Sequence, residues 1–183
     1  MIEKIPCILC VQRNKQFYSD AGLDFSNHPE GVVSIPPHDP DSCAKELREK
    51  TMEATGKEVA VVISDTEGII GLAGSIDIAR GSSGIEVLAR TFGELDRFNK
   101  PKFAGADNIP NELACASALL MGQTSEGIPA VLVRGLKYNK SEKGISDYSR
   151  TSKEYRKIFR EIMWESISII GVRRGIRLLF GKT

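Results

Sequence analysis

The chain alternates between short apolar runs and polar segments, and the apolar runs predict its strands. The run at residues 58–63 (E-V-A-V-V-I) is largely β-branched and lacks alternation of polar and apolar positions. Such a pattern is typical of a strand that is buried on both faces. Ser64, Asp65 and Thr66 follow at once, so we expect the strand to end there and the chain to turn at Gly68. Further strands are predicted over the following ranges: 6–11, 32–35 and 130–134.

Capping residues mark two helices. Asp39 followed by Pro40 predicts the N-terminus of a helix that continues to residue 55 and stops at Gly56. A second helix is predicted over residues 111–121, with Gly122 at its C-terminus. Residues 86–102 space their large apolar side chains roughly as a helix does, although the sequence N-K-P interrupts the pattern.

The C-terminal part has a character of its own. The sequence T-S-K-E at residues 151–154 is a capping box, and the apolar residues that follow fall on one helical face. The tail at residues 172–183 is basic and contains no acid, so it can pack on protein or lie on an anionic membrane or nucleic-acid surface. We therefore predict a mixed α/β (α+β) fold with a single domain over residues 1–150. A C-terminal helix and basic tail, residues 151–183, are expected to pack on it.

Length and charge narrow the possible functions. The 183 residues are 41% hydrophobic, which is enough for one good core. The 25 Lys and Arg residues nearly balance the 24 Asp and Glu residues, so the net charge of +1 gives no argument for nucleic-acid binding. No apolar run approaches the roughly 20 residues that span a bilayer, and the first residues do not resemble a secretory signal. These features predict a cytoplasmic protein without a membrane span.

The cysteines and histidines offer little catalytic chemistry. Cys7 and Cys10 lie in a predicted strand, where their thiols point to opposite faces, and Cys43 and Cys115 are scattered. We expect four free thiols and no zinc site. The two His residues stand beside no obvious nucleophile, which argues against a hydrolase of the Ser-His-Asp or Cys-His type. The phosphate-binding motifs G-x-x-x-x-G-K-[ST] and G-x-G-x-x-G are also missing.

Three polar segments carry candidate chemistry. Asp65 and Thr66 can offer oxygen ligands to a hard cation such as Mg²⁺ or Mn²⁺, or can simply form a capped turn. The loop at residues 20–27 can hold a cation or a phosphate, or form an Asx-type turn. In the glycine-bounded loop at residues 122–129, Gln123 and Thr124 are candidate oxygen ligands for a phosphate site or a metal.

These segments belong to a longer series of short motifs. The series reads A-G-L-D-x-S-N at 21–27, P-x-D-P-D-x-x-A at 37–44, S-D-T-x-G at 64–68, A-x-G at 79–81, N-E-L at 111–113, M-G-Q at 121–123 and G-I-P-A-V-L-V-R-G-L at 127–136. In its order and approximate spacing, the series resembles the coenzyme F420-0:γ-glutamyl ligase family. Members of that family add glutamate to the lactyl-phosphate tail of the deazaflavin coenzyme F420.

The resemblance implies a site and a reaction. Divalent metal, Mg²⁺ or Mn²⁺, would be held by Asp24, Asp65, Thr66 and Gln123, so we expect Asp24 and Asp65 to converge. The residues implied to contact the guanine nucleotide are Asn27, Met121, Gly122, Gln123, Thr124, Ser125, Glu126, Gly127 and Ile128. GTP would phosphorylate a carboxylate of F420-0 or a related acceptor, and the amine of L-glutamate would attack the acyl phosphate. A homodimer is implied as well.

The chain also departs from the family pattern. The family's S-D-T-x-G-R-P-x-R-x-G has Ile69, Ile70 and Leu72 here in place of its first arginine, its proline and its second arginine. A later aspartate and arginine are replaced by Arg90 and Phe92. Family members also extend further at the N-terminus. Two alternatives to an active ligase are therefore a split enzyme with a separate N-terminal subunit, and a non-catalytic relative that binds nucleotide and metal.

Overall fold

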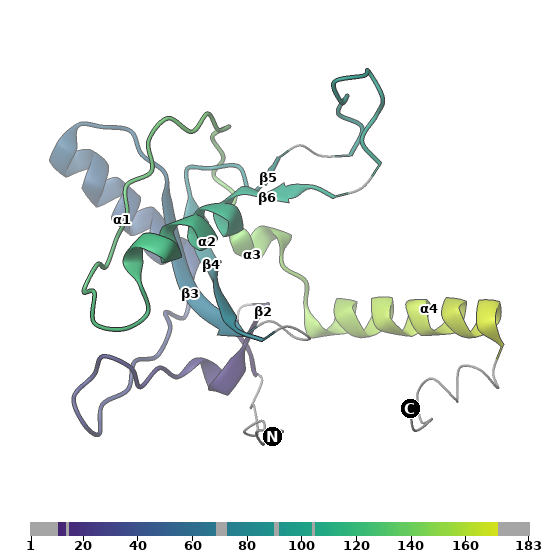
Figure 1. Cartoon of the computed structure of the whole chain (residues 1–183), viewed down its shortest axis with the longest axis horizontal. Helices are drawn as coiled ribbons and strands as arrows, with labels where there is room; N and C mark the ends of the chain where they lie inside the picture. The colour runs from purple at the N-terminus through teal and green to yellow at the C-terminus, as the bar shows by residue number, and fades with distance from the viewer. Residues whose placement is uncertain (1–10, 14, 69–72, 90–91, 104, 172–183) are drawn as a thin grey trace. The chain divides into compact units, whose positions relative to one another are not determined.

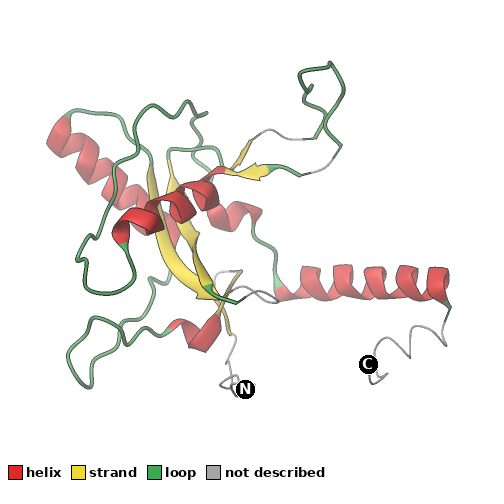
Figure 2. Ribbon diagram, in the orientation of Figure 1, coloured by secondary structure: helices red, strands yellow, loops and turns green. Residues whose placement is uncertain are grey.

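The computed structural model describes residues 11–13, 15–68, 73–89, 92–103 and 105–171 (Figure 1). The chain forms two compact units, residues 1–149 and 150–183. The first unit combines antiparallel strand pairs with helices, which confirms the predicted mixed α/β class (Figure 2). Its elements are β1 (Val11–Arg13), β2 (Gln16–Tyr18), the 3₁₀ helix η1 (Ser19–Gly22), α1 (Pro40–Thr55), β3 (Val61–Gly68), β4 (Ser75–Ser83), β5 (Leu88–Ala89), β6 (Asp107–Asn108), α2 (Ile109–Met121) and α3 (Ile145–Tyr148).

The β3–β4 hairpin is the centre of the first unit. Its strands pair antiparallel from Val61 opposite Ser83 to Gly68 opposite Ser75, with a register shift between Ile63 and Ser64. The predicted end of the strand at Ile63 is wrong, because β3 begins at Val61 and continues to Gly68. Its residues are half-buried or exposed rather than buried on both faces. Pairing with β4 satisfies the backbone of the polar segment, and this tertiary pairing overrides its turn preference.

Helix α1 begins and ends where the capping residues predicted. The Asp39 carboxylate accepts hydrogen bonds from the Ser42 backbone N–H at 3.2 Å and from the Ser42 hydroxyl at 2.8 Å. Pro40 occupies the first turn, and Gly56 ends the helix in the left-handed conformation, at φ 64°. Local contacts therefore fix the two ends of this helix.

Helix α2 lies across the hairpin and supplies part of the core. It starts at Ile109, two residues before the predicted start, because the Asn108 side chain accepts a hydrogen bond from the Asn111 N–H. Gly122 ends it as predicted. Figure 1 shows α2 in front of β3 and β4, with α1 also beside the hairpin. The core cluster draws on β4, α2, α3 and the segment after β4: Ala79, Val87, Ala114 and Ile145.

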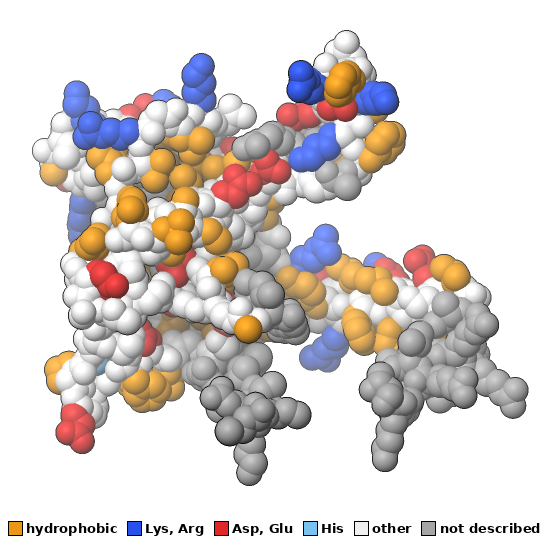
Figure 3. All heavy atoms as spheres, in the orientation of Figure 1, with side chains coloured by type: hydrophobic (Ala, Val, Ile, Leu, Met, Phe, Trp, Pro, Cys, Tyr) orange, Lys and Arg blue, Asp and Glu red, His pale blue; other side chains and the backbone are white. Residues whose placement is uncertain are grey.

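Three predictions for loop regions are wrong. Residues 92–103 are not helical, because the Asp96 carboxylate accepts hydrogen bonds from the N–H groups of Phe98 and Lys100 and turns the chain back. Residues 32–35 contribute only an isolated bridge between Ser34 and Asp24. The stretch 130–134 runs without strand pairing, and its side chains Leu132 and Val133 are exposed. Figure 3 shows hydrophobic side chains on the face where α2 lies.

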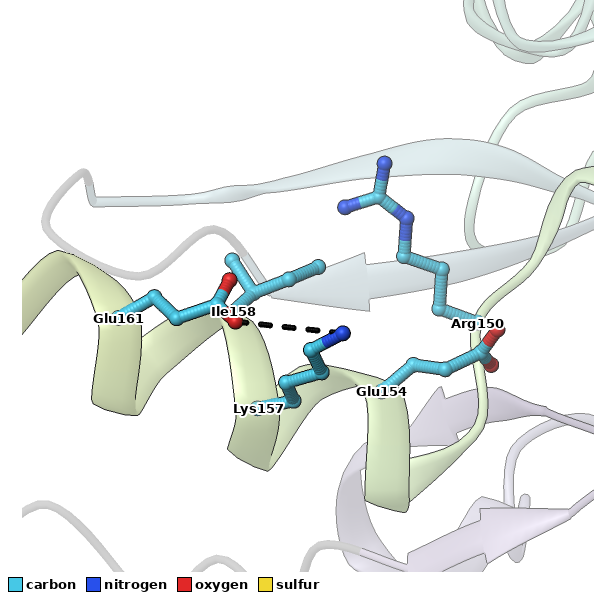
Figure 4. A pocket seen from close by; sticks show the side chains of 5 residues that line it. All are labelled: Arg150, Glu154, Lys157, Ile158 and Glu161. Atoms are coloured by element: carbon cyan, nitrogen blue, oxygen red, sulfur yellow. Dashed lines mark ion pairs between the residues drawn. The ribbon is translucent and has the colours of Figure 1, made fainter.

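The second unit is built on helix α4 (Ser152–Ile170). The predicted capping box is confirmed, since Thr151 and Glu154 bond reciprocally at its N-terminus. A shallow pocket beside the first turns is lined by Arg150, Glu154, Lys157, Ile158 and Glu161 (Figure 4). Lys157 and Glu161 form an ion pair at 4.0 Å across it. Packing of this unit on the first stays a prediction, and the basic tail at 172–183 lies outside the described residues.

Candidate functional site

Neighbouring residues of β3 project to opposite faces of the hairpin, because side chains alternate along a strand. Ser64 and Thr66 lie on one face and contact Asp77 of β4. Asp65 and Glu67 lie on the other face and contact Arg80 of β4. The hairpin thus carries two polar clusters back to back.

The Thr66 cluster consists of Ser64, Thr66, Asp77 and Gln123. The Thr66 hydroxyl lies 2.9 Å from Asp77 Oδ1 and 2.8 Å from Gln123 Oε1. Gln123 Nε2 donates to Asp77 Oδ1 at 3.0 Å, and Ser64 Oγ lies 3.4 Å from Asp77 Oδ2. Asp77 is only 4% exposed, whereas Thr66 and Gln123 face solvent. Oxygen atoms from both strands and from the end of α2 therefore converge above a buried carboxylate.

The backbone after α2 brings Gln123 to this place. Gly122 has φ 73°, in the left-handed region, and its N–H still bonds to Ala118 O at 3.0 Å. A side chain at Gly122 would overlap the Glu126 carboxylate. That carboxylate accepts a hydrogen bond from the Thr124 N–H at 2.8 Å, which lowers the pKa of Glu126. The loop thus folds back on itself directly after the helix, with Gln123 turned toward the hairpin.

The Arg80 cluster consists of Asp65, Glu67, Arg80 and Tyr18. Arg80 is 3% exposed, and its guanidinium bonds to Glu67 Oε2 at 2.6 Å and to Asp65 Oδ2 at 3.3 Å. It also donates to the Phe17 carbonyl at 2.7 Å and lies 4.0 Å above the Tyr18 ring. The cation is therefore fixed from several sides and joins β2 to the hairpin.

The two acids of the Arg80 cluster differ in the direction in which their pKa values are shifted. Burial raises the pKa of Asp65, although Arg80 acts in the opposite direction. Burial also acts to raise the pKa of Glu67, but hydrogen bonds from Ser19 and Arg80 outweigh it and hold the pKa below its ordinary value. The difference follows from the bonds, since Glu67 accepts from both the Ser19 N–H and Arg80, and its bond to Arg80 is the shorter one.

The loop that contains Asp24 is held by its own side chains. Asp24 Oδ1 accepts hydrogen bonds from the hydroxyl and the N–H of Ser26, both at 2.7 Å, and these bonds lower its pKa. Its backbone pairs with that of Ser34. Asn27 adopts φ 52°, which lies in the left-handed region. The loop has the Asx-type turn that the sequence allowed, and the convergence of Asp24 with Asp65 stays a prediction.

Comparison with known proteins decides the family. A family model described as F420-0:Gamma-glutamyl ligase matches residues 1–135. The chain belongs to the F420-0:gamma-glutamyl ligase family. The resemblance deduced from the short motifs is therefore confirmed.

Curated relatives carry the name coenzyme F420:L-glutamate ligase. The protein of Archaeoglobus fulgidus is 40% identical over 117 residues, which make up 64% of this chain and 47% of the relative. The protein of Methanopyrus kandleri is 40% identical over 130 residues, 71% of this chain and 52% of the relative. That of Methanothermobacter thermautotrophicus is 38% identical over 117 residues, 64% of this chain and 46% of the relative. The chain spans about half the length of the curated relatives it matches.

The F420-0:gamma-glutamyl ligase motifs occupy different parts of this geometry. Thr66 and Gln123, which were predicted as ligands of one site, meet at 2.8 Å although 57 positions separate them. Asp65 turns to the opposite face and pairs with Arg80. The predicted nucleotide loop, residues 121–128, begins at the same helix end as Gln123. The replaced positions Ile69, Ile70, Leu72 and Arg90 lie outside the described residues, as do Cys7 and Cys10.

Asp77 and Arg80 were not among the site residues predicted from the sequence. Each is a charged residue in the mostly apolar stretch I-D-I-A-R of β4, where most neighbours are buried or half-buried. A lone charge in such a strand indicates a buried partner, so this signal was available.

Cys43 and Cys115 are free thiols, and the Cys115 Sγ lies 3.1 Å from the Asp77 carbonyl.

The Thr66 cluster suits a hard cation. One carboxylate, one amide oxygen and hydroxyl oxygens form the donor set that Mg²⁺ and Mn²⁺ accept. Among the described residues, no group of three or more His, Cys, Asp or Glu side chains could hold a metal ion. Neutral oxygens would therefore have to complete the coordination of an ion at Asp77.

Within the part of the chain that the structure describes, no helix has the length and apolar character to cross a membrane.

Proposed function

We propose that this chain acts as a GTP- and divalent-metal-dependent ligase of the F420-0:gamma-glutamyl ligase type. It joins L-glutamate to a carboxylate acceptor, F420-0 or a related molecule, through an acyl phosphate. The metal is Mg²⁺ or Mn²⁺, the substrates are small molecules, and the protein works in the cytoplasm as a homodimer. Family membership over residues 1–135 supports the reaction class, and the names of the relatives suggest the acceptor.

One feature of the site geometry supports the proposal. Thr66 and Gln123 come from motifs in separate parts of the chain, and their side-chain oxygens lie 2.8 Å apart beside the buried Asp77. A turn that was only structural would not require this pairing. The coincidence of two motif residues at one solvent-facing point supports a binding site there.

The residues of the chain then have distinct tasks. When bound, a divalent cation neutralises the charge of a transferring phosphoryl group and helps to align it. Thr66 and Gln123 would hold that cation beside the buried Asp77, and the family resemblance implies Asp24 and Asp65 as further metal ligands. The loop at residues 121–128 and Asn27 would position the nucleotide, since a glycine-rich backbone can approach phosphate closely. Catalysis of this kind depends chiefly on positioning and electrostatics.

A ligation assay tests the function directly. The purified chain is incubated with F420-0, L-glutamate, GTP and Mn²⁺, and the glutamylated product is quantified by mass spectrometry. We expect GTP-dependent product formation that Gln123→Ala reduces by about 10- to 100-fold, the range typical of lost metal-site support. Asp39→Asn, which keeps the cap of α1, serves as a matched control. Folded protein that forms no product at any acceptor concentration would refute ligation by this chain.

A second function is favoured by one feature of the site. Because Arg80 engages the Asp65 carboxylate, the chain can be a relative that binds nucleotide and metal without ligating, alone or together with a separate N-terminal subunit. Calorimetry separates the two possibilities. Nucleotide binding without product in the ligation assay would support this second function, whereas turnover by the isolated chain would exclude it.

A further inference from the structure

The carboxylate of Asp77 is buried among neutral groups. Its three side-chain partners are Ser64, Thr66 and Gln123, none of which carries a charge. A carboxylate that is 4% exposed normally has a cationic partner, because burial of an unpaired charge is costly. The charge of Asp77 is therefore left for a ligand to neutralise.

The hydrogen bonding around Asp77 is also incomplete. The Thr66 hydroxyl has one proton, yet it lies within 2.9 Å of Asp77 Oδ1 and 2.8 Å of Gln123 Oε1, and both of these atoms are acceptors. With Asp77 as a carboxylate, one of the two contacts brings oxygen lone pairs together without a shared proton. A cation placed among these oxygens would turn that unfavourable contact into coordination.

On the opposite face, the Asp65 carboxylate already has a cation. The Arg80 guanidinium is buried and is fixed by Glu67, Phe17 and Tyr18. A divalent ion bound to Asp65 would lie close to this immobile positive charge in a partly buried place. Repulsion between like charges is strong in such surroundings, so the Arg80 side chain opposes an ion at Asp65.

We propose that this chain binds one divalent cation rather than two, with Asp77 joining Thr66 and Gln123 as its charged ligand, while the Arg80 guanidinium takes the place of a second cation at Asp65. The inference rests on the metal dependence proposed above and adds to it a ligand, a stoichiometry and a built-in counter-ion. Arg80 acts here as a positioning residue, because it holds Asp65 and touches no substrate.

Mn²⁺ binding to the full chain tests this inference without any assay of ligation. Free Mn²⁺ is measured by electron paramagnetic resonance during titration of metal-free protein, in the absence of nucleotide. We expect one ion per chain, and Asp77→Asn should weaken its binding by about 10- to 100-fold. Asp65→Asn should leave both affinity and stoichiometry unchanged within error. Asp39→Asn provides the control for loss of one surface charge.

A charge-balanced double variant tests the role of Arg80. Arg80→Gln together with Glu67→Gln removes one positive and one negative charge and leaves Asp65 without its cation. We expect this variant to bind a second Mn²⁺, with circular dichroism as the check on folding. If the double variant does not fold, the comparison of Asp77→Asn with Asp65→Asn decides by itself.

The outcomes separate this inference from the proposed function. Two ions bound to the wild-type chain, an equal loss of affinity in Asp65→Asn and Asp77→Asn, or no Mn²⁺ binding would each overturn it. A ligase that works with two ions would keep the proposed function and refute the inference. One ion that depends on Asp77, in a chain without ligase activity, would support the inference and count against the function.

Discussion

Residues 64–67 of β3 supply polar side chains to both faces of the β3–β4 hairpin. The two faces differ in whether a buried cation compensates their carboxylates. On the Arg80 face, Asp65 and Glu67 are compensated by a buried guanidinium that also joins β2 to the hairpin. On the Thr66 face, the more deeply buried Asp77 carboxylate has only neutral side-chain partners among the described residues. One face is complete as a structural unit, whereas the other is arranged to receive a charge. Stability and binding should therefore respond separately to substitutions on the two faces.

Removal of Arg80 should produce the largest effect. Arg80→Met keeps much of the side-chain bulk but leaves Glu67 and Asp65 without their cation, and breaking a buried pair from one side costs about 3–5 kcal/mol. The free energy of unfolding is measured by urea titration followed by circular dichroism, in the presence of a chelator. Lys140→Met is the matched control, because its ion pair with Glu58 is exposed on both sides and should contribute little to stability. A loss no larger than that of the control would show that the two faces do not differ as argued.

Asp77 should matter for metal binding and little for stability. Without metal, Asp77→Asn should not lower the free energy of unfolding, because Asn can keep hydrogen bonds to the same neutral partners and carries no buried charge. At an Mn²⁺ concentration 100 times the dissociation constant, the wild type should gain about 2.7 kcal/mol, and the variant should gain almost none. Unfolding curves with and without Mn²⁺ measure both values. Equal stabilisation of the two proteins by Mn²⁺ would contradict a role of Asp77 in binding.

The sequence predicted the capped helices α1, α2 and α4 well and the site only in part. Asp39, Pro40 and Gly56 fix α1 through local contacts, so its bounds could be read directly. The strand end at Ile63 was predicted wrongly because pairing with β4 is non-local and overrides the turn preference of Ser64 and Asp65. That error had a consequence for the site. With β3 extended to Gly68, alternation along the strand alone would have placed Asp65 and Thr66 on opposite faces.

Other features of the site depend on contacts that no local pattern encodes. The family motifs indicated both Thr66 and Gln123, but their meeting requires α2 to cross the hairpin and Gly122 to redirect the chain. Arg80 could have been recognised as a buried charge, but its choice of Asp65 as partner could not. That choice depends on the register of the two strands. Ile78, not Arg80, lies directly opposite Asp65, and the Arg80 guanidinium reaches Asp65 diagonally across the strands.

A smaller effect is expected from the hydroxyl that joins the hairpin to the loop after α2. Thr66→Val removes the contacts to Asp77 and Gln123 at nearly constant volume and should cost about 1 kcal/mol, the net value of an ordinary hydrogen bond. Thr66→Ser keeps the hydroxyl and should restore most of it. Hydrogen exchange of the backbone amides at residues 122–126 provides the second measurement. Exchange should be faster in Thr66→Val than in Thr66→Ser, and equal rates would mean that Thr66 does not anchor the loop.

The smallest effect separates the two acids of the Arg80 face by their pH dependence. The pKa of Glu67 is lowered on folding, so Glu67 stabilises the protein above its unfolded pKa, and this contribution is lost as the pH falls through the folded pKa. The pKa of Asp65 is raised on folding, so its charged form is a cost that is present at neutral pH and relieved as the pH falls through the folded pKa. At neutral pH, Glu67→Gln should therefore destabilise the protein, whereas Asp65→Asn should be neutral or slightly stabilising. Each change should be below about 1 kcal/mol, because Gln and Asn can keep a hydrogen bond to Arg80 and the other acid still compensates the guanidinium. Urea titrations between neutral pH and a pH below both ordinary carboxyl pKa values test this pair. The two variants should approach the wild type from opposite sides as the acids become protonated, and a shift of the same sign in both would mean that Arg80 does not favour Glu67 over Asp65.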